Sequence, residues 1–359
     1  MCALVSDEHT SGAVGWLRWR RRRMLGSMKD FFVADAAKFD GATVTTYFAI
    51  SSLSVREKKG GGGQYLALTL NDKSGSMEAR MWDEIASAMA TCSEGCFVKV
   101  QGQIAKYQGK FQITLTKMRL AAASEVDSAD FVPTTRFDIA EMWSELRGYV
   151  DAFQNADLRR LVFAFLDDQT IGPAYREAPA AKVLHHAWIG GLLEHVLTLV
   201  RVCRATAPFY PEVDPDLLVT GAILHDIGKV RELSWDIGFE YTIEGMLLGH
   251  IQIGAALAER TIDSLPNFPP KLKTLVLHMI LSHHGKLEFG SPKLPMIPEA
   301  LMLNFIDDLD AKMQAVSSEF DKSAREGKGA NELTNKVWSL DNRQLLNTKR
   351  WLGEDKDGK

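Results

Sequence analysis

The feature that most constrains the fold is a change in hydrophobic periodicity part of the way along this chain of 359 residues. Up to about residue 120, apolar and polar residues alternate, which is typical of β-strands with one buried face. From about residue 137 onward, apolar residues recur every three or four positions, which is typical of helices. A single core rarely extends over more than about 250–300 residues. The sequence therefore predicts two domains, the first built from strands and the second from helices.

Turn-forming segments divide the first domain into short strands. Gly60–Gly63 and Asn71–Gly75 are two such segments, because their composition interrupts a strand. The predicted strands cover residues 43–56, 64–70, 76–82, 97–104 and 111–120, and a short helix covers residues 83–90. Five strands with a helix between the third and the fourth follow the order of an OB-fold barrel. The predicted fold is therefore a five-stranded OB-fold barrel followed by an all-α helical bundle.

Composition sets the expected domain boundaries. We expect the barrel over residues 28–124, a small and polar linker over 125–136, the helical domain over 137–350 and a polar tail over 351–359. Residues 1–27 form a separate basic extension, which has three interpretations. It is a basic arm for RNA, a membrane-surface segment, or a disordered or untranslated stretch before a true start at Met28.

Charge and cysteine content narrow the class of protein. The formal net charge is −4, yet residues 29–124 carry twelve Lys and Arg against nine Asp and Glu. A locally basic first domain suits phosphate binding, and an acidic second domain suits metal cations. No apolar stretch approaches the roughly 18 residues of a membrane helix. Four cysteines without a CxxC pair favour a reduced, cytoplasmic setting.

The histidines are concentrated in one part of the second domain. Eight of the nine lie between His185 and His284. His225 and Asp226 are neighbours in the string Ala-Ile-Leu-His-Asp-Ile-Gly-Lys, at the end of an apolar helical run. Further candidate metal ligands lie on other predicted helices: His195, His250, His283, His284 and Asp307. Nitrogen and oxygen ligands without a thiolate favour Mn²⁺, Fe²⁺, Mg²⁺ or Zn²⁺, and two such ions suit phosphodiester hydrolysis.

The order of these residues resembles a known signature. The first set follows the H…HD…D pattern of HD-superfamily phosphohydrolases: His195, His225, Asp226 and Asp307. The additional histidines match the subset that holds two metals: His250, His283 and His284. This resemblance implies two divalent ions, with Mn²⁺ as the expected metal, and catalysis through Asp226.

Three further residues have more than one interpretation. Lys229 either neutralises the scissile phosphate or is a solvated lysine at a helix end. His186 either contacts the substrate or packs in the core. His284 is a ligand unless it faces away from its neighbour. Two other histidines are expected to be ordinary core or surface residues: His185 and His278.

A finer resemblance is to the YhaM-type 3′-to-5′ exoribonucleases, which join an OB domain to an HD domain. It rests on Ala178–Lys182, on His185–His195, and on Ser282–Gly285 running on to Gly290-Ser291-Pro292. The last tripeptide differs from the Gly-Tyr-Pro of the related cyclic-dinucleotide phosphodiesterases, which argues against that substrate. The resemblance implies exonucleolytic cleavage of single-stranded RNA to nucleoside monophosphates, with single-stranded DNA as a second candidate substrate. The oligomeric state is left open, and a homo-oligomer is compatible with the sequence.

The barrel carries candidate contacts for single strands, which OB folds bind by aromatic stacking and a basic groove. The candidates are Tyr65, Arg80, Trp82, Tyr107, Lys110 and Phe111. Aromatic residues in strands more often belong to the core, and that alternative applies to each of them. Two other functions also remain open. The chain either cleaves small nucleotides with the barrel as a regulator, or binds nucleic acid without catalysis.

Overall fold

The computed structural model describes residues 29–58, 62–122, 124–127, 130–182, 186–235 and 239–353. The described chain forms two compact units, and the second begins at Phe131 except for a short turn, Asp72–Ser74, that is grouped with it. This division falls inside the segment 125–136 that the sequence predicts as a linker. The basic extension before Met28 and the end of the polar tail lie outside the described residues. Within the described residues, no helix is both long enough and apolar enough to cross a membrane.

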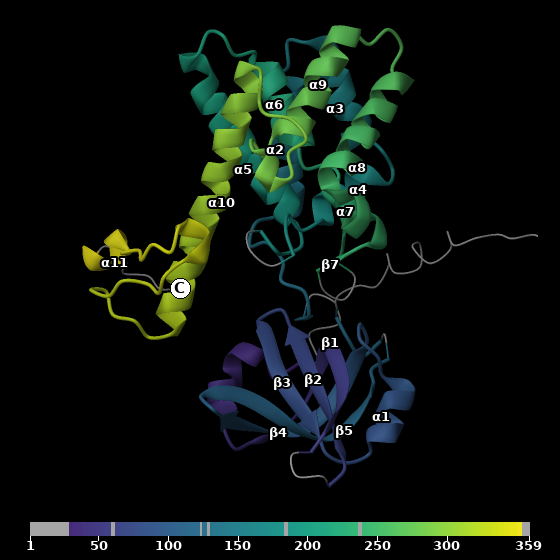
Figure 1. Ribbon diagram of the computed structural model, residues 1–359, viewed down its shortest axis with the longest axis vertical. Coiled ribbons are helices and arrows are strands. Elements are labelled where there is room, and N and C mark those ends of the chain that lie inside the picture. The colour runs from purple at the N-terminus through teal and green to yellow at the C-terminus, as the bar shows by residue number, and fades with distance from the viewer. Residues whose placement is uncertain are drawn as a thin grey trace, which may run out of the picture. The chain divides into compact units, whose positions relative to one another are not determined.

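The first unit is a closed five-stranded barrel (Figure 1). Its strands are β1 (Thr43–Glu57), β2 (Gln64–Asp72), β3 (Gly75–Met81), β4 (Phe97–Tyr107) and β5 (Lys110–Leu120). A 3-10 helix, η1 (Val33–Phe39), precedes β1, and α1 (Ile85–Thr91) lies between β3 and β4. The strand order is β1-β2-β3-β5-β4, and β3 runs parallel to β5. The predicted OB-fold barrel is confirmed.

β1 closes the barrel because it pairs with two neighbours. Its first half, up to Ala49, pairs antiparallel with β4, and its second half pairs antiparallel with β2. The register shifts between Ile50 and Ser52, so the strand bends there. Along β2, Leu66, Leu68 and Leu70 are buried, as the alternation predicts. The intervening side chains therefore lie on the outer surface of the barrel.

The second unit is an all-α bundle with one small hairpin, which confirms the predicted class. Its first helices are α2 (Ile139–Asp151), α3 (Ala156–Leu166), α4 (Ile171–Glu177), α5 (Gly191–Thr206), α6 (Pro215–Leu224) and α7 (Lys229–Glu232). After the two short strands β6 (Leu233–Ser234) and β7 (Glu240–Tyr241) come α8 (Ile243–Ser264), α9 (Pro270–Ser282), α10 (Pro298–Arg325) and α11 (Thr348–Trp351). The 3-10 turns are η3 (Ala207–Phe209), η4 (Leu287–Phe289) and η5 (Trp338–Leu340).

α6 is the buried centre of this bundle. Every residue from Leu217 to Leu224 is buried, and α5, α9 and α10 all pack against the helix. The helix begins after Asp214, whose carboxylate accepts hydrogen bonds from two backbone N–H groups of the first turn. Because α6 ends at Leu224, the residue that follows it, His225, is placed in the interior of the unit.

Candidate metal centre and nucleic-acid face

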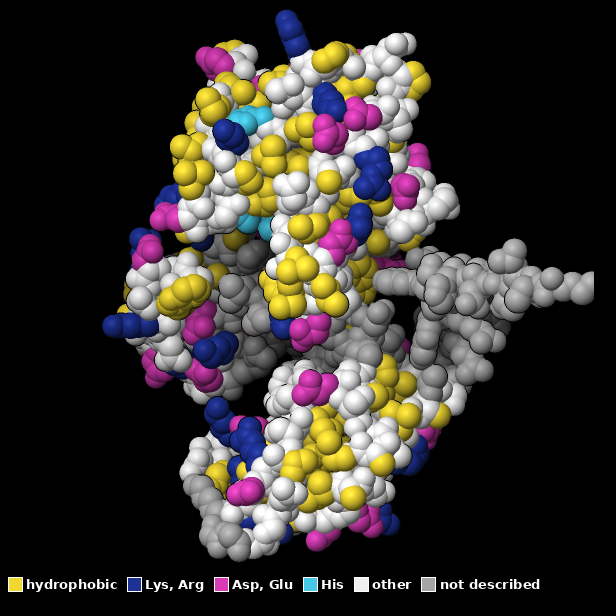
Figure 2. Space-filling model, turned by 45° about the vertical axis from the view of Figure 1, so that its right-hand side comes forward, with side chains coloured by type: hydrophobic (Ala, Val, Ile, Leu, Met, Phe, Trp, Pro, Cys, Tyr) yellow, Lys and Arg dark blue, Asp and Glu magenta, His cyan; other side chains and the backbone are white. Residues whose placement is uncertain are grey.

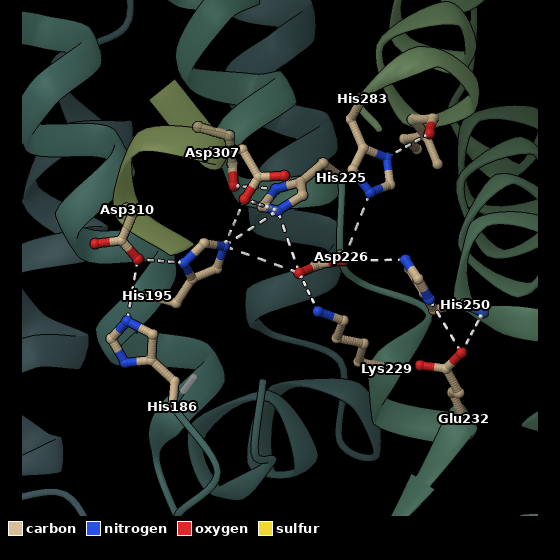
Figure 3. Close-up of polar contacts among 12 residues, drawn as sticks. His186, His195, His225, Asp226, Lys229, Glu232, His250, His283, Asp307 and Asp310 are labelled. Atoms are coloured by element: carbon tan, nitrogen blue, oxygen red, sulfur yellow. Dashed lines mark hydrogen bonds and ion pairs between the residues drawn. The ribbon is translucent and has the colours of Figure 1, made fainter. Parts of the chain in front are cut away.

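Asp226 lies at the centre of a cluster of histidines and carboxylates (Figure 3). Its side chain is 4% exposed, and its two carboxylate oxygens face different partners. Oδ2 lies 2.6 Å from Nζ of Lys229, and on the same side it faces His225 at 3.2 Å and His195 at 3.9 Å. Oδ1 faces His250 and His283 on the opposite side. The single carboxylate of Asp226 therefore lies between two groups of candidate ligands.

The first group consists of His195 on α5, His225 at the end of α6, and Asp307 on α10. Nε2 of His195 lies 3.4 Å from Nε2 of His225 and 3.2 Å from Oδ1 of Asp307. Nε2 of His225 lies 3.2 Å from Oδ2 of Asp226. The candidate ligand atoms of the three residues lie within 4.8 Å of one another, so one ion can reach all three.

The second group consists of His250, His283 and His284, whose candidate ligand atoms also lie within 4.8 Å of one another. Nε2 of His250 is 3.4 Å from Oδ1 of Asp226, and Nε2 of His283 is 3.7 Å from the same oxygen. Gly249 has φ +71° and interrupts α8, so that His250 begins a new helical segment. Both members of the doubled pair at the end of α9 face the cluster, including His284.

Each of the five histidines in the two groups directs its Nδ1 atom away from Asp226, toward a hydrogen-bond acceptor. The acceptors are Asp310 for His195 at 2.7 Å, the Ala222 carbonyl for His225 at 2.9 Å, Glu232 for His250 at 3.0 Å, the Ile280 carbonyl for His283 at 2.7 Å, and the Phe289 carbonyl for His284 at 2.8 Å. None of these acceptors carries a proton to donate, so each Nδ1 carries the hydrogen. This arrangement directs the five Nε2 atoms into the cluster, as the outer hydrogen bonds of metal-binding histidines do.

Buried polar atoms without a hydrogen-bond partner indicate whether a metal ion fits the cluster. In the described part of the chain, three buried atoms around the second group have no hydrogen-bond partner: Nε2 of His250, Nε2 of His283, and Oδ1 of Asp226, which faces them. Unpaired buried polar atoms are costly, and a bound cation would satisfy all three. The donors are imidazole nitrogens and carboxylate oxygens, which suit divalent first-row metals and Mg²⁺. The side chains present therefore fit a divalent metal centre.

The carboxylates of the cluster are held in their charged form. Burial opposes ionisation of Asp226, but the ammonium group of Lys229 and the contact with His225 outweigh this effect and hold the pKa of Asp226 well below its usual value. Burial also raises the pKa of Asp310, but the hydrogen bonds from His186 and His195 lower it to about 2. Asp226 is therefore ionised at neutral pH, and the ionised carboxylate is the form that binds a cation.

The two remaining predicted catalytic residues, Lys229 and His186, differ in their burial and in their contact with the centre. Nζ of Lys229 donates to Oδ2 of Asp226 at 2.6 Å, and the side chain is 12% exposed, so it is not a solvated lysine. His186 is fully buried, and its Nε2 donates to Asp310 at 3.0 Å. Among the contacts described, His186 is connected to the centre through Asp310 and His195. Catalytic roles for Lys229 and His186 stay predictions.

Two histidines lie outside the cluster or outside the described residues. Nε2 of His278 accepts a hydrogen bond from the backbone N–H of Met296 at 2.9 Å, which is the structural role expected for it. His185 falls among the residues that the structure does not describe.

Gly228 is required by the close approach of two backbones. A Cβ atom at this position would lie 2.0 Å from the carbonyl oxygen of His250, a distance that no side chain tolerates. The glycine that follows the His225-Asp226 pair therefore allows α8 to lie directly against it. This contact brings the second group of ligands to Asp226.

The outer face of the barrel carries the predicted nucleic-acid contacts. Tyr65 on β2 and Trp82 after β3 stack with ring centroids 4.8 Å apart and an interplanar angle of 29°. The guanidinium of Arg80 lies 5.1 Å from the ring centroid of Tyr107. Phe111 lies beside Lys106, and Lys110 is exposed. Trp82 and Tyr107 are exposed and Tyr65 is half-buried, whereas Phe111 is half-buried and packs against the core of the barrel, so the core alternative stays open for Phe111. Contact with nucleic acid stays a prediction for all six residues.

Sequence reasoning missed two acidic residues that orient the ligands. Asp310 accepts hydrogen bonds from His195 and His186, and Glu232 accepts from both the backbone N–H and the ring of His250. The spacing of Asp310, three residues after Asp307 on one helix, is a signal that was present in the sequence. No comparable pattern marks Glu232.

Comparison with known proteins agrees with this architecture. Residues 192–312 match the HD domain family, and residues 53–121 match the family described as OB-fold nucleic acid binding domain. The protein named 3′-5′ exoribonuclease YhaM from Bacillus velezensis is 36% identical over 306 residues, which cover 85% of this chain and 95% of that protein. The protein of the same name from Bacillus licheniformis is 38% identical over 312 residues, which cover 85% of this chain and 95% of that protein. The protein of the same name from Listeria monocytogenes is 36% identical over 308 residues, which cover 86% of this chain and 96% of that protein. The chain therefore belongs to the YhaM family of 3′-5′ exoribonucleases.

Proposed function

We propose that this protein is a metal-dependent 3′-to-5′ exoribonuclease that hydrolyses single-stranded RNA to nucleoside monophosphates. The observation that carries the proposal is the pair of ligand groups that share Asp226, in a chain that aligns with the YhaM proteins over most of its length. We further propose Mn²⁺ as the metal and the cytoplasm as the location.

The proposed chemistry assigns a role to each part of the centre. Divalent ions, when bound, supply the positive charge that activates a water molecule and stabilises the charge that develops on the phosphate. Asp226 and the six residues of the two groups would hold the ions. Lys229 would place its ammonium group beside the scissile phosphate, since it lies next to the shared carboxylate. His186 would act as a positioning residue, because its contact with the centre runs through Asp310 to His195.

The barrel would hold the strand upstream of the cut. Stacked Tyr65 and Trp82 offer a flat apolar surface, and Arg80 beside Tyr107 adds a positive charge. Base stacking on aromatic side chains tolerates any sequence and excludes paired bases. We therefore expect degradation to stop at stable duplexes.

The test uses the full chain, Mn²⁺ and single-stranded RNA or DNA labelled at the 5′ end. Stepwise shortening of the labelled RNA from its 3′ end, with release of nucleoside monophosphates, is the expected result. Asp226→Asn should abolish it, whereas Asp308→Asn should not, because Asp308 lies on α10 in an exposed pair with Lys312. Immediate release of the 5′ label would refute the proposed polarity. Hydrolysis of a small phosphodiester without hydrolysis of RNA would favour the small-nucleotide alternative instead.

A further inference from the structure

In the described part of the chain, the ligands of the metal centre are not equally exposed, which distinguishes a closed side from an open side. His225 and His283 are 0% exposed and His195 is 1% exposed, so they line the closed side. The partly exposed members are Asp307, His250 and His284. A substrate must therefore approach past these three residues, and the segments that flank them form the rim of the site.

A compact loop projects from this rim. It covers residues 285–291 and includes η4. Gly285 and Gly290 both have positive φ, and the loop is closed by backbone hydrogen bonds from Gly290 to Leu287 and from Ser291 to Lys286. Ser291 is 2% exposed, and its hydroxyl contacts the carbonyl of Leu281 at 3.0 Å, which anchors the far end of the loop to α9. The loop is thus a fixed structure.

This fixed loop presents an aromatic ring to solvent. Phe289 is 59% exposed, although its own carbonyl accepts the Nδ1 hydrogen of His284 at 2.8 Å. The ammonium group of Lys286 lies 5.0 Å from the centroid of the ring. Its ion pair with Glu288, at 3.5 Å, is exposed and therefore weak. A large apolar ring beside a cation is the combination that binds a base and its phosphate.

We infer that Phe289 and Lys286 form the binding site for the 3′-terminal nucleotide of the RNA, with the base stacked on the Phe289 ring. This inference rests on the proposed function. The aromatic face of the barrel serves the upstream strand, so the helical unit needs its own contact for the nucleotide that is released. The hydrogen bond from His284 to the backbone carbonyl of Phe289 ties this loop directly to a residue that would hold a metal ion. Figure 2 shows histidine side chains that reach the surface of the helical unit among hydrophobic side chains.

The first test measures binding without turnover. Metal-free protein is mixed with single-stranded RNA that carries 2-aminopurine at either the terminal or the penultimate position. Stacking on Phe289 should change the fluorescence of the terminal base, and Phe289→Ala should remove this change while Phe289→Trp retains it. Leu287→Ala is the matched control, because Leu287 is exposed on the same loop but offers no ring. A fluorescence change confined to the penultimate base, or one that Phe289→Ala does not alter, overturns the inference.

The second test measures kcat/KM for the first cleavage, with RNA whose 3′-terminal nucleotide carries a base or is abasic. The wild-type protein should prefer the base by roughly tenfold, as expected for one stacking contact, and Phe289→Ala should lose the preference. Phe289→Trp and Leu287→Ala should keep it. If RNA is degraded but the preference does not depend on Phe289, only the nucleotide site is refuted. If RNA is not degraded at all, the proposed function fails, and the fluorescence test still decides whether Phe289 stacks on the base.

Discussion

Replacement of Asp310 by asparagine should weaken metal binding without unfolding the protein. The carboxylate accepts hydrogen bonds from Nδ1 of His195 at 2.7 Å and from Nε2 of His186 at 3.0 Å. Both bonds are made by the same oxygen, Oδ2, which is buried. Asparagine has nearly the same shape but no negative charge, and its amide has one oxygen and one donor group. It therefore fixes the His195 ring less firmly and makes the imidazole a weaker ligand.

The expected loss of metal affinity follows from the position of Asp310, which would not bind an ion itself but accepts a hydrogen bond from the ligand His195. Loss of an outer hydrogen-bond partner of a metal-binding histidine typically costs about 10–100-fold in metal affinity. That range corresponds to a loss of about 1.4–2.7 kcal/mol in the free energy of metal binding. Asp308→Asn is the control, since Asp308 lies on the same helix but its side chain is 53% exposed and pairs only with Lys312 among the contacts described.

The assay is a calorimetric titration of the stripped proteins with Mn²⁺, accompanied by thermal unfolding in a chelator. We expect Asp310→Asn to bind Mn²⁺ more weakly by about 10–100-fold, Asp308→Asn to bind like the wild type, and excess Mn²⁺ to restore part of the hydrolysis. Wild-type affinity in a folded Asp310→Asn protein would refute the argument that Asp310 positions His195.

Three further predictions concern the rest of the centre, pH and the barrel. Glu232→Gln should lower Mn²⁺ affinity by about tenfold in the same titration, because Glu232 holds the ring of His250; unchanged affinity would contradict this. Burial lowers the pKa of His195, but hydrogen bonds to two carboxylates raise it to about 9, above the usual value of 6.5. The metal-free protein should therefore lose up to about 3 kcal/mol of unfolding free energy as the pH rises from 6.5 through 9, and urea unfolding of the Mn²⁺-loaded protein should not show this loss. Trp82→Ala should weaken binding of single-stranded RNA by about 1–3 kcal/mol in a fluorescence titration at fixed salt, and an unchanged affinity would show that the stacked pair does not contact the strand.

Periodicity was sufficient to predict the fold, because the two domains bury their residues with different repeats. Every predicted strand overlaps an observed one, and the helix expected at 83–90 is found at Ile85–Thr91. Periodicity alone does not predict the order of the strands around the barrel. The parallel pairing of β3 with β5 joins segments that are far apart in the chain, and no local pattern indicates it.

The candidate ligands could be predicted because imidazole is rare and was concentrated in one segment. The outer carboxylates were missed, because an acidic residue in a helix is usually exposed. The spacing of Asp310 from Asp307 is compatible with a shared face but does not show that this face is buried. Asp310 is 7% exposed and Asp308 is half-exposed, although the two differ only in which side of α10 they occupy. That difference depends on how α10 packs against α5, which is a tertiary contact.

The position of each histidine along its helix explains which ones need a carboxylate partner. His225 and His283 each follow the last residue of a helix, where the carbonyl groups of the final turn lack partners. Each donates its Nδ1 hydrogen to the carbonyl three residues earlier, so the backbone alone orients the ring. His195 lies inside α5, where the carbonyl groups are already bonded, and it therefore depends on Asp310.

His250 lies at the start of a helical segment, after the break at Gly249, where unpaired N–H groups rather than carbonyls are available. Glu232 accepts from the backbone N–H of His250 at 2.9 Å and from its ring at 3.0 Å, so one carboxylate both caps the segment and orients the ligand. Single substitutions of an outer carboxylate should therefore weaken the coordination by His195 or His250 but leave that by His225 and His283 intact. The first group has one ring held by the backbone and one held by a side chain, and the second group has two rings held by the backbone and one held by a side chain. Neither group therefore depends on carboxylates alone for its geometry.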